Sequence, residues 1–150
     1  MRVHDYIDYW AQRIPDDVYA TDGARTITWA EMRTWTNKVG RWLAGQLEPE
    51  TRFGVLAKNS LEILAVYFGA SRAGVVPVPL NTRLAPPEWA FILSDAAVEF
   101  VVAEHEFADA IDGIRDGLLK QCSVIGAPRA KWTDFSDDVG CQTDGPLARR

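Results

Sequence analysis

Cysteine is scarce in this 150-residue chain. Cys122 and Cys141 are the only two cysteines, they lie far apart in the sequence, and no Cys-x-x-Cys motif is present. This spacing excludes a disulfide framework and is typical of reduced thiols in an intracellular protein. We therefore expect a cytoplasmic protein.

Long apolar runs are also missing. The N-terminus, Met1 to Asp5, lacks the apolar core of a secretory signal, and no later run approaches the roughly 20 residues that a membrane-spanning helix needs. We expect no transmembrane segment.

Positive charge is not concentrated anywhere. The chain has 16 Lys and Arg against 21 Asp and Glu, a net charge of −5 and a pI near 5.0, and its basic residues are scattered. Binding to nucleic acid requires a basic stripe, so no nucleic-acid partner is expected. With 47% hydrophobic residues, the chain can form one core but is too short for two ordinary domains.

The common phosphate-binding motifs are absent. Neither G-x-G-x-x-G nor G-x-x-x-x-G-K-[ST] occurs in the chain. The predicted helix starts instead carry the carboxylates of Glu31, Glu62, Glu88 and Glu104. Because a carboxylate complements the positive end of the helix dipole and repels phosphate, these helix starts are interpreted as structural.

Candidates for catalysis or metal binding are few. His4 and His105 are the only histidines. The sequence Glu104-His105-Glu106, with Asp109 one turn later, could be proposed as a metal cluster, but a single histidine on an acidic helix start favours a solvated surface. Neither histidine is accompanied by a nucleophile, so we assign no catalytic residue and no metal ligand.

Hydrophobic periodicity predicts alternating helices and strands. Helices are expected at residues 4–14, 28 to about 45, 59–73, 87–95 and about 104–119; strands at Phe53–Ala57, Val75–Val78, Phe100–Ala103 and Ser123–Ile125; and a hairpin at residues 18–28 around Asp22-Gly23. Such alternation favours an α/β fold of βαβ units, with a largely parallel sheet, helices on both faces and an early β-hairpin.

Residues 127–150 lack a hydrophobic period and contain glycine, proline and clustered aspartate. This composition predicts a linker or mobile tail. We therefore divide the chain into a folded part, residues 1–126, and a tail, residues 127–150.

The stretch from Arg72 to Leu84 (RAGVVPVPLNTRL) is the most informative part of the chain. Gly74 is the expected residue for a left-handed helix end. Pro77 lacks the N–H that an interior strand position donates, which predicts an edge, bulge or sheet-end position in the strand Val75–Val78. The loop Asn81-Thr82-Arg83-Leu84 then leaves the end of that strand.

This stretch, with Pro87–Asp95 after it, resembles the N-terminal region of the AMP-forming adenylating enzymes, especially the acyl-CoA synthetases. Ile27–Met32 (ITWAEM) and Val55–Ser60 (VLAKNS) resemble two further motifs of that family. The resemblance implies a complete enzyme that uses ATP and Mg²⁺ to activate a carboxylic acid, in particular a fatty acid, to acyl-AMP and then transfers the acyl group to CoA. It also implies that residues 1–126 belong to the large adenylating domain and that residues 127–150 lead toward its phosphate loop.

That phosphate loop and the late catalytic lysine of the family are not among these 150 residues. We therefore expect the segment alone to be inactive and to bind no cofactor tightly. Its partner would be the remainder of the adenylating domain, and an apolar surface left uncovered would favour self-association.

Arg83 is the one residue to which the resemblance attaches a ligand. In CoA ligases the corresponding arginine lies near the nucleotide end of CoA, and an arginine can bind a phosphate through two parallel hydrogen bonds. The alternative is a surface ion pair between Arg83 and Glu88 at the next helix start.

Two other functions remain open from the sequence. The βαβ pattern fits a non-catalytic flavodoxin-like binding or interaction module, although the apolar helix at Leu61–Phe68 requires cover on nearly every side. The resemblance also admits a fragment of an acyl-AMP ligase or of an amino-acid adenylating enzyme, which gives its acyl group to a carrier protein.

Overall fold

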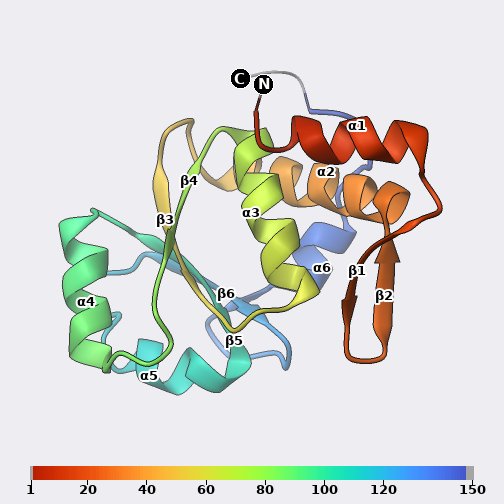
Figure 1. Ribbon diagram of the computed structural model, residues 1–150. Coiled ribbons are helices and arrows are strands. Elements are labelled where there is room, and N and C mark those ends of the chain that lie inside the picture. The colour runs from red at the N-terminus through yellow and green to blue at the C-terminus, as the bar shows by residue number, and fades with distance from the viewer. Residues whose placement is uncertain (1, 148–150) are drawn as a thin grey trace. The chain divides into compact units, whose positions relative to one another are not determined.

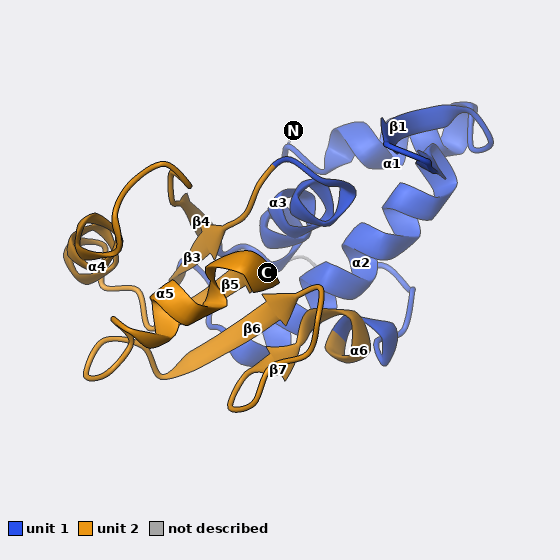
Figure 2. Cartoon of the chain, turned by 90° about the horizontal axis from the view of Figure 1, so that it is seen from below, with its two compact units in different colours: residues 1–50, 59–75, 139–150 blue, residues 51–58, 76–138 orange. Residues whose placement is uncertain are grey.

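The computed structural model describes residues 2–147 of the chain. The described residues form two compact units, each assembled from segments that are distant in sequence. Unit 1 comprises Met1–Glu50, Asn59–Val75 and Val139–Arg150, and unit 2 comprises Thr51–Lys58 and Val76–Asp138 (Figure 2). The boundaries between the two units therefore do not coincide with the boundary at residue 126 that was taken from the sequence.

Helices form most of unit 1. They are α1 (Asp5–Arg13), α2 (Trp29–Gln46) and α3 (Leu61–Ala73), and the antiparallel hairpin of β1 (Val18–Asp22) and β2 (Arg25–Thr28) lies between α1 and α2 in the chain (Figure 1). None of the helices within residues 2–147 combines the length and the apolar character needed to cross a membrane.

The helix ends in unit 1 follow from their capping residues. At the start of α2, Thr28 Oγ1 accepts the Glu31 N–H at 3.2 Å and the Glu31 carboxylate accepts the Thr28 N–H at 2.8 Å, so the two residues form a capping box. Ser60 caps α3 by accepting the Ile63 N–H at 3.3 Å, so this helix starts one residue later than the expected range of 59–73. Gly74 ends α3 with a φ of 73°, the left-handed conformation expected there.

Helices α2 and α3 pack against each other at small residues. A Cβ added at Gly40 would lie 2.9 Å from the Cβ of Arg72, so only glycine allows this approach of the two backbones. No residue of α3 is exposed, which confirms that this helix is covered on nearly every side.

A five-stranded parallel sheet forms the centre of unit 2. Its strands are β3 (Arg52–Leu56), β4 (Val76–Pro79), β5 (Phe100–Glu104), β6 (Gln121–Ile125) and β7 (Thr133–Asp134), in the spatial order β4-β3-β5-β6-β7. Strand β4 lies at an edge, as Pro77 predicted. The predicted α/β class, with parallel strands flanked by helices and a separate hairpin, is confirmed.

One face of this sheet carries the core of unit 2. Helices α4 (Pro86–Asp95) and α5 (Ala108–Asp112) supply Trp89, Leu93 and Ile111 to a buried cluster that contains Leu56 of β3 and Val101 of β5. A Cβ at Gly54 would lie 2.8 Å from the Leu93 and Val101 side chains, so β3 requires a residue without a side chain there.

Two sequence predictions differ from the structure. The helix expected at about residues 104–119 is reduced to a 3₁₀ turn, η1 (His105–Phe107), followed by the short α5. Gly113 and Gly117 weaken a helix there, and Gly117 adopts a left-handed φ of 72°. Asp112 accepts hydrogen bonds from Arg115, Arg129 and Trp132, contacts that hold the following loop instead.

The expected tail is also more ordered than its composition suggested. Residues 127–147 include β7 and the short helix α6 (Phe135–Gly140), and the side chains of Trp132, Phe135 and Val139 are buried. A two-residue strand is too short to produce a detectable period, and the neighbouring aspartates mask these apolar positions.

Candidate functional site

The loop that follows β4 is held by the residues that surround it in unit 2. The Leu80 N–H donates to the Val55 carbonyl at 2.8 Å, which keeps the start of the loop against β3. Asn81 then organises the turn, because its Oδ1 accepts the Arg83 N–H at 3.0 Å and its carbonyl accepts the Leu84 N–H at 3.1 Å. The indole N–H of Trp89 donates to the same carbonyl at 2.8 Å. The backbone of Arg83 is therefore fixed on both sides.

The side chain of Arg83 is exposed at the end of this fixed loop. Within residues 2–147, no hydrogen bond or ion pair of its guanidinium is found, and the predicted alternative of a pair with Glu88 is not formed. The Glu88 carboxylate instead accepts the Ala85 N–H at 2.8 Å and caps α4. The loop thus presents a cation with unused donors, which can hold a phosphate through paired hydrogen bonds.

An apolar surface adjoins Arg83 in the chain. Leu84, Pro87, Phe91 and Ile92, with Glu88, line a shallow pocket of about 340 Å³. Phe91 is 71% exposed, which is unusual for so large an apolar side chain.

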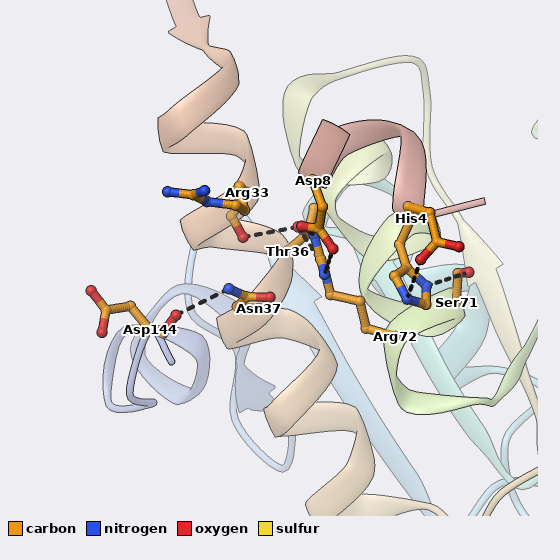
Figure 3. Close-up of polar contacts among 9 residues, drawn as sticks. His4, Asp8, Arg33, Thr36, Asn37, Ser71, Arg72 and Asp144 are labelled. Atoms are coloured by element: carbon orange, nitrogen blue, oxygen red, sulfur yellow. Dashed lines mark hydrogen bonds and ion pairs between the residues drawn. The ribbon is translucent and has the colours of Figure 1, made fainter. Parts of the chain in front are cut away.

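Sequence reasoning missed a buried ion pair in unit 1. Arg72 is only 6% exposed, yet its guanidinium binds both carboxylate oxygens of Asp8, at 2.7 and 3.0 Å, and donates from Nε to Thr36 Oγ1 at 3.0 Å (Figure 3). Helix α1 supplies Asp8, helix α2 supplies Thr36 and helix α3 supplies Arg72, so this pair joins three helices. No local pattern marks it, because the two charges are 64 positions apart.

His4 lies beside this pair, at the start of α1. Its Nδ1 is 3.0 Å from Ser71 Oγ (Figure 3). Burial, and then the neighbouring Arg72 charge, lower the pKa of His4 below its ordinary value of 6.5, although Asp5 and Asp8 act in the opposite sense. The neutral form of His4 is therefore favoured in the folded chain.

We expect this histidine to make folding stability depend on pH. As the pH falls below about 6.5, the unfolded chain binds a proton at His4 more readily than the folded chain does, so stability decreases on acidification. His4→Gln should flatten this dependence between pH 7.5 and pH 5.5, as measured by the urea midpoint. His105→Gln is the matched control, since His105 is exposed. A wild-type pH dependence in His4→Gln would contradict this role.

The acidic residues around His105 form hydrogen bonds and ion pairs within unit 2. Glu104 accepts the Lys58 N–H at 3.0 Å, and Glu106 pairs with the Lys58 ammonium at 2.7 Å. Asp109 pairs with Arg129 at 2.6 Å. Among residues 2–147, no group of three or more His, Cys, Asp and Glu side chains is arranged to hold a metal ion.

The two cysteines are both free thiols. Cys122 is buried, and burial raises its pKa to about 11, so it is not a reactive nucleophile. Cys141 is exposed. Trp29 and Trp42 are buried, and Trp10 and Trp35 are half-buried.

Comparison with known proteins identifies the family. Residues 7–144 match the model of the AMP-binding enzyme family. The chain belongs to this family. The match confirms the resemblance to the N-terminal region of the adenylating enzymes on which the role of Arg83 rests.

Individual relatives of this AMP-binding family member are CoA ligases. The chain is 32% identical over 137 residues to a 3-hydroxybenzoate–CoA ligase of Aromatoleum sp. (strain CIB), which covers 89% of this chain and 26% of that ligase. It is 38% identical over 90 residues to a long-chain-fatty-acid–CoA ligase of Mycobacterium tuberculosis (strain ATCC 25618 / H37Rv), covering 59% and 18% of the two chains.

The fold agrees with a solved member of the family. The anthranilate CoA ligase AuaEII, crystallised in complex with anthranoyl-AMP, matches with a TM-score of 0.94 and 26% identity, covering 100% of this chain and 30% of that chain. The chain thus spans between 18% and 26% of the length of the two curated relatives. It corresponds to part of an adenylating enzyme.

Proposed function

We propose that the complete protein, in which this segment is followed by the remainder of the adenylating domain, is an AMP-forming acid–CoA ligase. It would join a carboxylic acid to ATP with release of pyrophosphate, and then transfer the acyl group from acyl-AMP to the thiol of CoA with release of AMP. The match of residues 7–144 to the AMP-binding enzymes, with CoA ligases among the relatives, supports this proposal most directly.

In this proposal the segment is scaffold, with one contact to the acyl acceptor. The acceptor contact is Arg83, whose free guanidinium at the end of β4 would bind a phosphate of CoA. ATP and Mg²⁺ would be bound by the remainder of the domain. A cytoplasmic location belongs to the same proposal and rests on the two free thiols.

Helices α2, α3 and α4 each carry a carboxylate in the first turn. Glu31 and Glu88 accept the backbone N–H groups of Thr28 and Ala85, both at 2.8 Å. Glu62, in the first turn of α3, pairs with Arg25 at 2.6 Å, which lowers the pKa of this carboxyl and keeps it ionised. A phosphate would be repelled at each of these helix starts.

We therefore expect the isolated 150 residues to catalyse no acid-dependent ATP–pyrophosphate exchange, whereas the complete protein does. The assay measures labelled pyrophosphate incorporated into ATP, with and without acid, against a sample without protein. Exchange by the isolated segment above that control would show that a nucleotide site lies within it. Self-association of the segment remains a prediction and is read from sedimentation at several concentrations.

The acid is proposed as a carboxylic acid without restriction to one class. One curated relative is named for 3-hydroxybenzoate and another for long-chain fatty acids. The exchange assay on the complete protein should therefore include benzoates and fatty acids of several lengths. The acid with the highest kcat/KM identifies the class, and no exchange with any of them would oppose the proposal.

A carrier protein is the alternative acyl acceptor, and a binding module without catalysis is the other alternative. The reading frame beyond Arg150 separates the binding module from both kinds of adenylating enzyme. A loop rich in Ser, Thr and Gly with a lysine supports an adenylating enzyme, and its absence favours the binding module. CoA dependence of AMP release then separates a CoA ligase from an enzyme that loads a carrier.

A further inference from the structure

Two side chains of α2 hold the last described part of the chain. Asn37 Nδ2 donates to the Asp144 carbonyl at 3.1 Å, and Arg41 Nε donates to the Thr143 carbonyl at 3.4 Å. Arg41 Nη2 also donates to the carbonyls of Gly145, at 2.8 Å, and Pro146, at 3.4 Å. We call Thr143–Pro146 the anchored segment, because the carbonyls of all four residues are bound by these two side chains.

The anchored segment has little else to fix it. Residues 143–146 belong to no helix or strand, and within the described chain their backbone groups form no hydrogen bond to other backbone groups. Irregular backbone of this kind normally forms its hydrogen bonds with water. Binding of four successive carbonyls by protein side chains is therefore a specific feature of this segment.

The other side of the contact is firmly built. Asn37 and Arg41 are four residues apart, which places them on one face of α2. That helix begins with a capping box and packs against α3 at Gly40. The position of Arg41 on α2 is therefore well defined, and its guanidinium can hold the anchored segment in one place.

The orientation of Asn37 indicates that the contact is maintained at some cost. Asn37 is 6% exposed, and its Oδ1 is buried without a hydrogen-bond partner among the described residues. Figure 3 shows the hydrogen bond from Asn37 Nδ2 to the Asp144 carbonyl. Rotating the amide by half a turn would break this bond and place Oδ1 against the carbonyl oxygen. The Asp144 contact therefore fixes the amide in an arrangement that leaves an acceptor unsatisfied.

We propose that Asn37 and Arg41 are positioning residues that fix the chain at the point where it leaves this segment for the remainder of the adenylating domain. The proposal rests on the function proposed above, under which the nucleotide-binding residues lie beyond residue 150 and are reached through the anchored segment. Arg41 acts on the backbone alone, so the sequence of the anchored segment is free to vary while its path stays fixed.

The anchoring itself can be tested on the 150-residue chain. Cys141 is exposed and close in sequence to the anchored segment, whereas Cys122 is buried with its pKa raised to about 11, so a trifluoromethyl thiol reagent labels Cys141 selectively. Arg41→Ala should raise the fraction of detached segment, read from the ¹⁹F NMR line of the label, about 10- to 100-fold. Lys38→Ala is the control, since Lys38 also lies on α2 and no hydrogen bond or ion pair joins it to the anchored segment. Equal spectra for wild type and Arg41→Ala would overturn the proposal.

The consequence for catalysis is tested in the complete protein. Arg41→Ala should raise the KM for ATP in pyrophosphate exchange about tenfold, Arg41→Lys should restore part of the loss, and Lys38→Ala should leave the KM unchanged. A fall in kcat in proportion to the folded enzyme, with the KM unchanged in Arg41→Ala, would show a merely structural role and overturn the proposal. If the complete protein adenylates no acid, the proposed function fails, while the ¹⁹F measurement still decides whether Arg41 anchors the chain.

Discussion

Replacing Arg83 with alanine in the complete enzyme is expected to raise the KM for CoA about ten- to a hundredfold and to leave adenylate formation unchanged. The reason is that a charge-assisted contact contributes roughly 1.5–3 kcal/mol, and that Arg83 has no competing partner within residues 2–147. Its backbone is held by Asn81, so little ordering of the loop is needed when a phosphate binds.

Two further variants make this measurement specific. Arg83→Lys keeps the charge but cannot form paired hydrogen bonds, so an intermediate KM for CoA is expected. Arg52→Ala is the matched control, because Arg52 is also an exposed arginine of unit 2. It lies at the start of β3, whereas the loop with Arg83 follows Pro79, which pairs with Val55 at the other end of β3. An unchanged KM for CoA in Arg83→Ala, or an equal loss of adenylation, would assign Arg83 to the scaffold.

Removing the carboxylate of Asp8 should cause a large loss of stability in the segment. In Asp8→Ala the guanidinium of Arg72 stays buried at 6% exposure without its counter-ion, which is expected to cost about 2–4 kcal/mol of the free energy of unfolding. This loss is smaller than that of a fully buried ion pair, since Asp8 itself is 36% exposed and water already weakens the pair. Urea denaturation measures this loss.

Replacing the other partner, Arg72, should reduce the free energy of unfolding less. In Arg72→Met the apolar stem that packs near Gly40 is retained, and the half-exposed Asp8 can be hydrated once its partner is gone. Asp16→Ala, which removes an exposed carboxylate just after α1, should leave the urea midpoint unchanged. A loss below about 0.5 kcal/mol in Asp8→Ala, the range of ordinary surface substitutions, would mean that the ion pair is not a structural requirement.

Predictions from the sequence succeeded where one residue type has one dominant physical consequence. Gly74 ends α3 because glycine readily adopts a positive φ, and Pro77 marks an edge strand because it lacks an N–H. The Thr28–Glu31 capping box was predictable for the same reason, since both partners are three positions apart. These local rules also located the strand end from which Arg83 projects.

Features that depend on distant partners could not be predicted in this way. Asp8 and Arg72 form a pair across 64 positions, and Arg41 reaches carbonyls more than 100 positions away, at separations of 102 to 105 residues. The order in residues 127–147 arises from single apolar side chains such as Trp132, whose indole N–H donates to Asp112 at 2.9 Å. Isolated residues of this kind produce no periodic signal in a sequence.

The measurement that bears most directly on the proposed function is the product analysis of the complete protein with acid, ATP, Mg²⁺ and CoA. An acid–CoA ligase releases AMP and forms acyl-CoA in equal amounts, and removing CoA should stop the thioester while pyrophosphate exchange continues. Equal yields of AMP and acyl-CoA are the result expected here. Acyl-AMP that accumulates in the presence of CoA, and is consumed only when a carrier protein is added, would contradict the assignment of CoA as the acceptor.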